Sequence, residues 1–148
     1  KNDFTLGREM NIENFYKFKE ILFVPEEKES NEVVIFNISA GNEHVLALDS
    51  KMRLWGWGKN NMKQINPFIN NEEIKRPIII TVPNNMRVVQ IYALNNNSLI
   101  IGSGNLVYIW GSYKDKFTGT GKVKNDQGYL DKFVKMDKVS YFLSNDIK

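Results

Sequence analysis

Side chains that commonly carry out catalysis are scarce in this sequence. His44 is the only histidine and there is no cysteine, so the usual histidine and cysteine metal sites cannot be assembled from it. The carboxylates occur singly or beside lysines, without a spacing that suggests paired acid–base chemistry. Residues 119–122 read GTGK, but a Walker phosphate loop would need Gly at 116 and Ser or Thr at 123, where Lys116 and Val123 stand. The sequence therefore predicts no catalytic residue, no metal and no cofactor.

Composition narrows the class of protein further. The 148 residues carry a net charge of +3 and a pI near 9.0, which is too mildly basic to indicate nucleic acid as a partner on its own. The longest apolar runs, such as residues 78–82, are too short to cross a membrane, so no membrane contact is predicted. The absence of cysteine fits a nuclear or cytosolic compartment.

An internal repeat is the strongest signal in the chain. Residues 38–58 align without a gap with residues 91–111, at a constant offset of 53. The identical residues include Ile38/Ile91, Ala40/Ala93, Asn42/Asn95, Leu46/Leu99, Trp57/Trp110 and Gly58/Gly111. Self-similarity at a period of tens of residues is typical of repeat architectures.

The pattern inside each copy predicts strands. Apolar runs at residues 45–48 and 99–101 suit strands buried on both faces, and residues 51–55 alternate. Turn residues separate these runs, and no stripe at helical spacing persists. Each copy is therefore expected to form an antiparallel sheet of three or four strands, stacked on its neighbour as in a propeller.

The repeated residues resemble the repeat of the regulator of chromosome condensation family of seven-bladed propellers. The first copy holds the family pattern A-G-x-x-H-x-x-A-L, an apolar position and W-G at Ala40, Gly41, His44, Ala47, Leu48, Leu54, Trp57 and Gly58. The second copy keeps Trp110 and Gly111 but has Leu94 and Asn97 in place of the Gly and His. Residues 60–66 (NNMKQIN) resemble the family's N-x-x-G-Q-L-G but lack both glycines. The resemblance implies a structural role for His44 inside the blade, hydrogen-bonded to neighbouring backbone.

The resemblance implies an all-β fold, a partial seven-bladed β-propeller with about two to three blades of antiparallel four-stranded sheets. Residues 1–32 would end one blade and connect it to the next, residues 33–86 and 87–138 would each form a blade, and residues 139–148 would begin a further one. The remaining blades of the same propeller are then expected as partners. Trp57 and Trp110 are predicted to occupy equivalent, buried places in consecutive blades.

One segment resembles a functional element of this family. Residues 110–115 (WGSYKD) are similar to the wedge by which the family's nuclear exchange factor contacts the small GTPase Ran. The resemblance implies a GTPase-binding loop with Tyr113, Lys114, Asp115 and Phe117. It also implies GTPase-contacting acids after the motif glycines, at Glu43 and Asp146. The corresponding place in the second copy, at Asn95 and Asn96, has no acid.

Two functions of different class follow from the resemblance. The first is a guanine-nucleotide exchange factor for a Ran-type small GTPase, acting at chromatin in the nucleus. The second is a non-catalytic propeller scaffold for protein–protein interaction within a larger multidomain protein, with the cytoplasm as the alternative location. The lysines between residues 114 and 138 are interspersed with aspartates, which is typical of a solvated face, while a basic rim that touches chromatin or another protein is the sharper interpretation.

Overall fold

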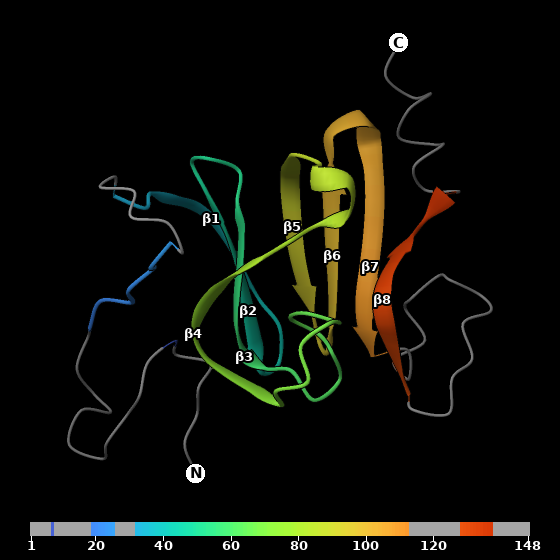
Figure 1. The fold of residues 1–148 in the computed structure, drawn as a ribbon, viewed down its shortest axis with the longest axis horizontal. Coiled ribbons are helices and arrows are strands. Elements are labelled where there is room, and N and C mark those ends of the chain that lie inside the picture. The colour runs from blue at the N-terminus through green and yellow to red at the C-terminus, as the bar shows by residue number, and fades with distance from the viewer. Residues whose placement is uncertain (1–6, 8–18, 26–31, 113–127, 138–148) are drawn as a thin grey trace.

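The computed structural model describes residues 7, 19–25, 32–112 and 128–137. The first sheet contains β1 (Ile35–Ala40), β2 (His44–Asp49), β3 (Leu54–Lys59) and β4 (Glu73–Ile80) in the order β1-β2-β3-β4. The second contains β5 (Val88–Leu94), β6 (Asn97–Gly102), β7 (Leu106–Ser112) and β8 (Tyr129–Lys135) in the order β5-β6-β7-β8. All neighbouring strands are antiparallel, and the two sheets stand side by side (Figure 1). The fold is nearly all-β and matches a partial propeller.

The two sheets repeat each other in register as well as in order. Val45 pairs with Trp57 in the first sheet, and Ser98, at the same offset of 53, pairs with Trp110 in the second. The same correspondence holds along the whole β2–β3 and β6–β7 ladders. Trp57 and Trp110 are 1% and 0% exposed, so the prediction of equivalent buried tryptophans is confirmed.

A bulge interrupts each third strand at the repeated glycine. The register shifts between Gly56 and Gly58 in the first sheet and between Ile109 and Gly111 in the second. Gly58 has a φ of 104° and Gly111 a φ of 102°, in the region that residues with a Cβ rarely adopt. A Cβ at Gly58 would also lie 2.5 Å from Glu43 O in the β1–β2 turn, and a Cβ at Gly111 would lie 2.5 Å from Asn96 O in the β5–β6 turn. The glycine after each Trp is therefore required by both conformation and space.

The two apolar runs that were predicted to form fully buried strands differ in how buried they are. Every residue of β2 is buried, as its continuous apolar run predicts. In β6, Leu99 and Ile101 remain partly exposed, so the same prediction is wrong for these two side chains. They share a sheet face with Tyr92 of β5, which is 42% exposed, because Leu99 pairs with Tyr92 across the ladder. The opposite face of β5 and β6 packs on the first sheet.

The packing between the sheets builds one continuous core. Strand β5 lies against β1 and β2, and residues from both sheets belong to a single buried apolar cluster. On the other side of the first sheet, Phe23 lies edge-on to Trp55 and Trp57, at ring-centroid distances of 5.3 and 5.6 Å. Among the described residues, no helix has the length and apolarity to cross a membrane.

Candidate functional site

The β1–β2 and β5–β6 hairpin turns and the β3–β4 connection gather at one end of the molecule, where β7 ends and β8 begins. We call this end the turn face and define it by residues 41–43, 60–72 and 95–96 together with Ser112 and Gly128. It lies at the lower edge of Figure 1. A hydrogen bond of 2.9 Å from Asn42 N to Asn95 O ties the first turn directly to the second. The turn face is thus a single surface made by two successive repeats.

Glu43 is the one predicted GTPase-contacting residue within the described part of the chain. Its side chain on the turn face is 49% exposed, and both carboxylate oxygens lie 2.8 Å from Lys59 Nζ. The backbone of Lys59 also donates to Glu43 O at 2.7 Å. The carboxylate is accessible to a partner, but its charge is already shared with a neighbouring lysine.

The other predicted contact residues lie outside the described residues. They are Tyr113, Lys114, Asp115, Phe117 and Asp146. The structure does place the residues that flank 113–127: Ser112 N donates to Asn96 O at 2.9 Å, and Gly128 precedes β8. Because β7 ends and β8 begins on the turn face, both ends of this segment lie on the same face as Glu43.

His44 forms a polar joint between the two sheets. Its Nε2 lies 2.9 Å from Ser98 Oγ, and Ser98 Oγ donates to Gln64 O at 2.5 Å. Since the serine proton is used on Gln64, the imidazole Nε2 is assigned as the donor toward Ser98. His44 Nδ1 is buried without a partner among the described residues. The buried position inside the blade that was expected for His44 is found, but its hydrogen-bond partner is the Ser98 side chain of the next sheet, where neighbouring backbone was expected.

Burial sets the protonation state of this histidine. It lowers the pKa of His44 from 6.5 to about 4, although the nearby backbone of Asn97 acts in the opposite direction. His44 is thus neutral at physiological pH, as its role in the joint requires. A general base for chemistry near pH 7 would need a pKa much closer to that pH.

The β3–β4 connection is held rigid by Asn60. Its Oδ1 accepts from the backbone nitrogens of Ile65 and Asn66, each at 3.0 Å, and its Nδ2 donates to three backbone carbonyls. Lys63 has a φ of 59° at the position where the family's motif has glycine. The backbone thus keeps the conformation that the glycine would favour, although the sequence lacks it.

The same connection carries the contact surface for the second sheet. Ile65 O accepts from Trp110 Nε1 at 3.1 Å. Phe133 of β8 covers Trp110, with ring centroids 4.7 Å apart, and Phe68 of the connection lies 5.7 Å from Phe133. Residues 60–72 therefore connect the two blades through these contacts, and they also form part of the turn face.

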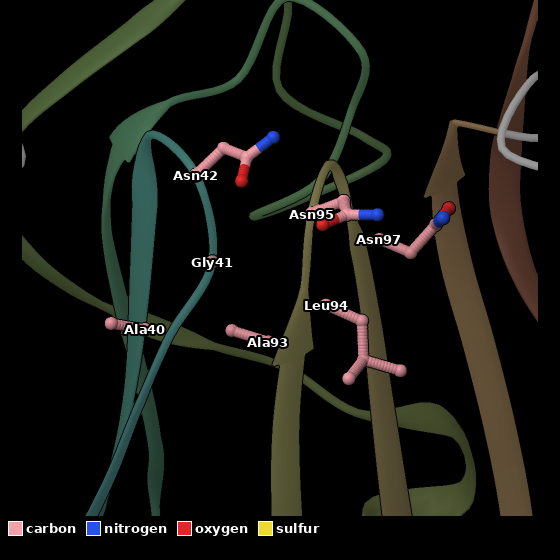
Figure 2. Close-up of a pocket in the computed structure, with 7 residues that line it drawn as sticks. All are labelled: Ala40, Gly41, Asn42, Ala93, Leu94, Asn95 and Asn97. Atoms are coloured by element: carbon pink, nitrogen blue, oxygen red, sulfur yellow. The ribbon is translucent and has the colours of Figure 1, made fainter.

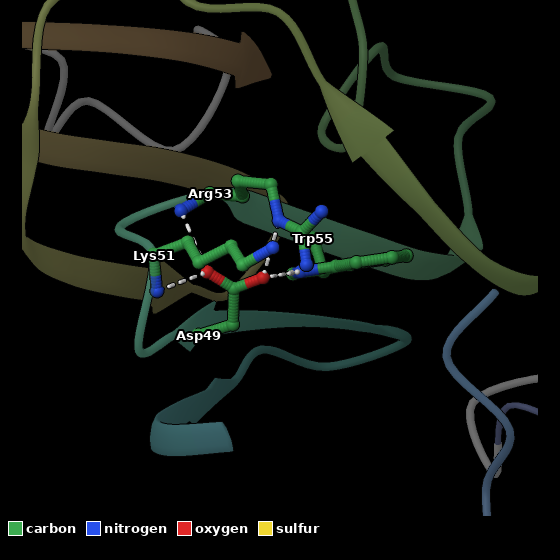
Figure 3. A network of polar contacts seen from close by, with 4 residues as sticks. All are labelled: Asp49, Lys51, Arg53 and Trp55. Atoms are coloured by element: carbon green, nitrogen blue, oxygen red, sulfur yellow. Dashed lines mark hydrogen bonds and ion pairs between the residues drawn. The ribbon is translucent and has the colours of Figure 1, made fainter. Parts of the chain in front are cut away.

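A buried carboxylate organises the opposite end of the first sheet. Asp49 is 1% exposed and accepts from Lys51 N, from Arg53 N and Nε, and from Trp55 Nε1, at 2.6 to 3.0 Å (Figure 3). Burial alone would raise the pKa of Asp49, but the hydrogen bonds from Trp55 and Arg53 outweigh it and lower the pKa. The cluster is fully paired and closes the β2–β3 hairpin.

Sequence reasoning did not find Ser98, Asp49 or the partners of Asn60. Ser98 aligns with Val45, so the repeat carried no sign of a hydroxyl in this place. For Asp49 the sequence does offer a signal, because an Asp four residues before an Arg suggests the ion pair with Arg53. Among the described residues, no group of three or more histidines or carboxylates is placed to hold a metal ion.

Comparison with known proteins identifies the repeat. Residues 37–64 match the family model of the regulator of chromosome condensation (RCC1) repeat. The chain is 32% identical over 88 residues to the ultraviolet-B receptor UVR8 of Arabidopsis thaliana, a match that covers 60% of this chain and 20% of UVR8. It is 38% identical over 72 residues to the Rho GTPase-activating protein gacGG of Dictyostelium discoideum, covering 49% of this chain and 6% of gacGG. The chain thus spans a fifth or less of the length of these relatives.

A solved structure shows the same fold. Yeast RCC1 (Prp20), in its complex with Kap60, superposes with a TM-score of 0.50 at 24% identity, covering 68% of this chain and 24% of the yeast chain. The matched residues 37–64 contain strands β2 and β3, the ladder that recurs in β6 and β7. Residues 37–64 of this chain thus match a repeat of the regulator of chromosome condensation type, and the chain folds as two neighbouring blades of a β-propeller.

Proposed function

We propose that the turn face binds a Ran-type small GTPase, and that the protein containing this chain is its guanine-nucleotide exchange factor, acting at chromatin in the nucleus. One observation carries the proposal. The exposed Glu43 lies on the same face as the two ends of residues 113–127, which contain Tyr113 and Phe117. An exposed acid, and a segment with two aromatics whose ends lie on the same face, suit a protein partner.

The proposed activity makes and breaks no covalent bond. An exchange factor binds the nucleotide-free GTPase more tightly than the loaded one, so the nucleotide affinity falls by the same factor. A thousandfold reduction needs about 4 kcal/mol of differential binding. Strands β7 and β8 fix both ends of the loop, so less of this free energy would be spent on ordering it. Tyr113 and Phe117 would supply the apolar contact, and Lys114 and Asp115 would orient it.

A non-catalytic scaffold is the second candidate. The chain matches only 6% of gacGG, which supports the use of such repeats as one part of a much longer protein. The place equivalent to Glu43 in the second blade, at Asn95 and Asn96, has lost the acid. A scaffold would bind a partner through the same face without weakening nucleotide binding.

Nucleotide release distinguishes the two candidates. The protein containing this chain is mixed with a Ran-type GTPase loaded with a fluorescent GDP analogue, and the release rate is compared with the spontaneous rate. We expect acceleration, and a loss of tenfold or more on Tyr113→Ala with Phe117→Ala. We expect a smaller loss on Glu43→Gln, while Glu32→Gln serves as the matched control, because Glu32 is exposed near the opposite end of the sheet, before β1.

Equal release rates for the wild type and the aromatic double variant would remove the wedge assignment. Binding of the GTPase without any acceleration of release would favour the scaffold. A folding control is needed for both variants, and the fluorescence of the three tryptophans provides it, because all three are buried.

A further inference from the structure

Phe68 leaves most of its ring in solvent on the turn face. It lies in the β3–β4 connection, is 69% exposed, and packs against Phe133 of the second blade, with ring centroids 5.7 Å apart. The other large apolar side chains that are exposed in the described part of the chain lie in β1, in β5, or at residues 22, 24 and 34. Those on the strands can be covered by a further sheet stacked on the blades. Phe68 already lies where two blades meet and is still exposed, so the stacking of sheets does not account for it.

A hydrogen-bonded turn fixes the backbone that carries this ring. Ile69 N donates to Asn66 O at 3.4 Å, which closes a β-turn over residues 66–69 with Pro67 at its second position. Phe68 N donates to Asn66 Oδ1 at 2.9 Å, so the asparagine side chain caps the turn from within. Asn66 and Pro67 are both buried, whereas Phe68 between them and Ile69 faces solvent.

The residue after the turn is held as firmly. Ile69 O accepts from Asn60 Nδ2 at 3.1 Å and from Lys63 Nζ at 2.8 Å, and Lys63 Nζ also lies 3.0 Å from Asn70 Oδ1. A connection with this many hydrogen bonds loses little conformational entropy when a partner binds to it. The phenyl ring adds only two side-chain torsions that binding must fix. Rigid, exposed aromatic side chains of this kind are typical anchors of protein interfaces.

Phe68 belongs to a surface whose other parts are also fixed. The hairpin turns of the two blades lie side by side (Figure 2), and Asn42 N donates to Asn95 O at 2.9 Å. Glu43 follows Asn42 in the first of these turns, and its carboxylate is held by Lys59. Phe133, against which Phe68 packs, lies in β8, the strand that begins on the turn face directly after Gly128. Phe68 thus shares one face with Glu43 and with the ends of residues 113–127.

We propose that Phe68 is a further partner-binding residue of the turn face, and that its ring enters an apolar pocket of the small GTPase. The inference rests on the proposed binding of a Ran-type GTPase to this face. It requires binding but no acceleration of nucleotide release, so it holds equally for an exchange factor and for a scaffold that binds the GTPase.

The test measures the dissociation constant of the protein containing this chain for a nucleotide-free Ran-type GTPase by isothermal titration calorimetry. Phe68→Ala removes the ring. Phe36→Ala is the matched control, because Phe36 is 52% exposed near the start of β1, at the end of the sheet opposite the turn face. We expect Phe68→Ala to weaken binding at least tenfold relative to this control, which corresponds to about 1.4 kcal/mol.

Urea unfolding of the same variants separates a binding role from a structural one. Because the ring is largely exposed, Phe68→Ala should unfold at a urea concentration close to that of the wild type. Equal dissociation constants for Phe68→Ala and Phe36→Ala would overturn the inference while leaving the proposed function in place. Weaker binding that comes with a clear loss of stability would also overturn it, since the ring would then act by packing on Phe133. A wild type that does not bind the GTPase at all would refute the proposed function, and this inference with it.

Discussion

Replacing His44 by asparagine should change how the stability of the protein depends on pH. The second repeat already holds a buried asparagine, Asn97, in the equivalent place, so the substitution is sterically compatible with this position. At pH 7.5 the variant loses the hydrogen bond to Ser98 and should be less stable by about 1 to 2 kcal/mol. His44→Asn thus isolates the contribution of the imidazole to the joint.

The magnitude follows from the pKa of His44. The folded value of about 4 lies below the ordinary value of 6.5, so between these pH values the unfolded chain binds more protons than the folded one. The stability contribution is therefore complete above pH 6.5 and is lost as the pH falls toward 4. The full loss corresponds to about 3 kcal/mol, of which about 2.5 kcal/mol should be lost by pH 4.5.

Urea unfolding at pH 7.5, 6.0 and 4.5, followed by tryptophan fluorescence, measures this effect. His44 is the only histidine, so the difference between wild type and His44→Asn removes the contribution of carboxylates common to both. We expect the wild type to be more stable at pH 7.5 and the variant to be more stable at pH 4.5. If the wild type exceeds the variant in free energy of unfolding by the same amount at both pH values, the assignment of His44 as a neutral, buried member of the joint is refuted.

Three further perturbations probe other parts of the two blades. Gly111→Ala should destabilise the protein by several kcal/mol in urea unfolding, because its Cβ would meet Asn96 O at 2.5 Å. Gly104→Ala, also at positive φ but with open space around it, should cost only about 1 kcal/mol. Equal losses of stability in the two variants would argue against the bulge. Trp110→Ala should cost about 3 to 5 kcal/mol by leaving a cavity between the blades, and a calorimetric loss below 1 kcal/mol would contradict its burial. Asp49→Asn should flatten the fall in the free energy of unfolding below about pH 3.8. The folded state lowers the pKa of Asp49, so this carboxylate stabilises the protein above the unfolded pKa, and the stabilisation is lost as the pH falls below it. An unchanged dependence of stability on pH in this acid range would exclude this role.

Local pattern was sufficient for the blade architecture. The gapless match of residues 38–58 to 91–111 predicted equivalent strands, and the ladders β2–β3 and β6–β7 pair at the same offset. It succeeded because strand alternation, turn residues and a glycine after each tryptophan act over a few residues, and such short-range constraints repeat whenever the sequence does. The correspondence continues through the bulges at Gly58 and Gly111 and ends in the connections, since 60–72 and 113–128 differ in length.

Contacts between the blades could not be obtained in this way. His44 meets Ser98 across 54 residues of sequence, and Trp110 donates to Ile65 across 45. The repeat aligned Ser98 with Val45, so its hydroxyl had no counterpart that would reveal the partner. Placing Glu43 on the same face as Ser112 likewise required the two sheets to be docked. Pairing within the short hairpins is decided by residues close along the chain, whereas the joint and the shared face depend on how two finished surfaces fit together, which only the tertiary structure decides.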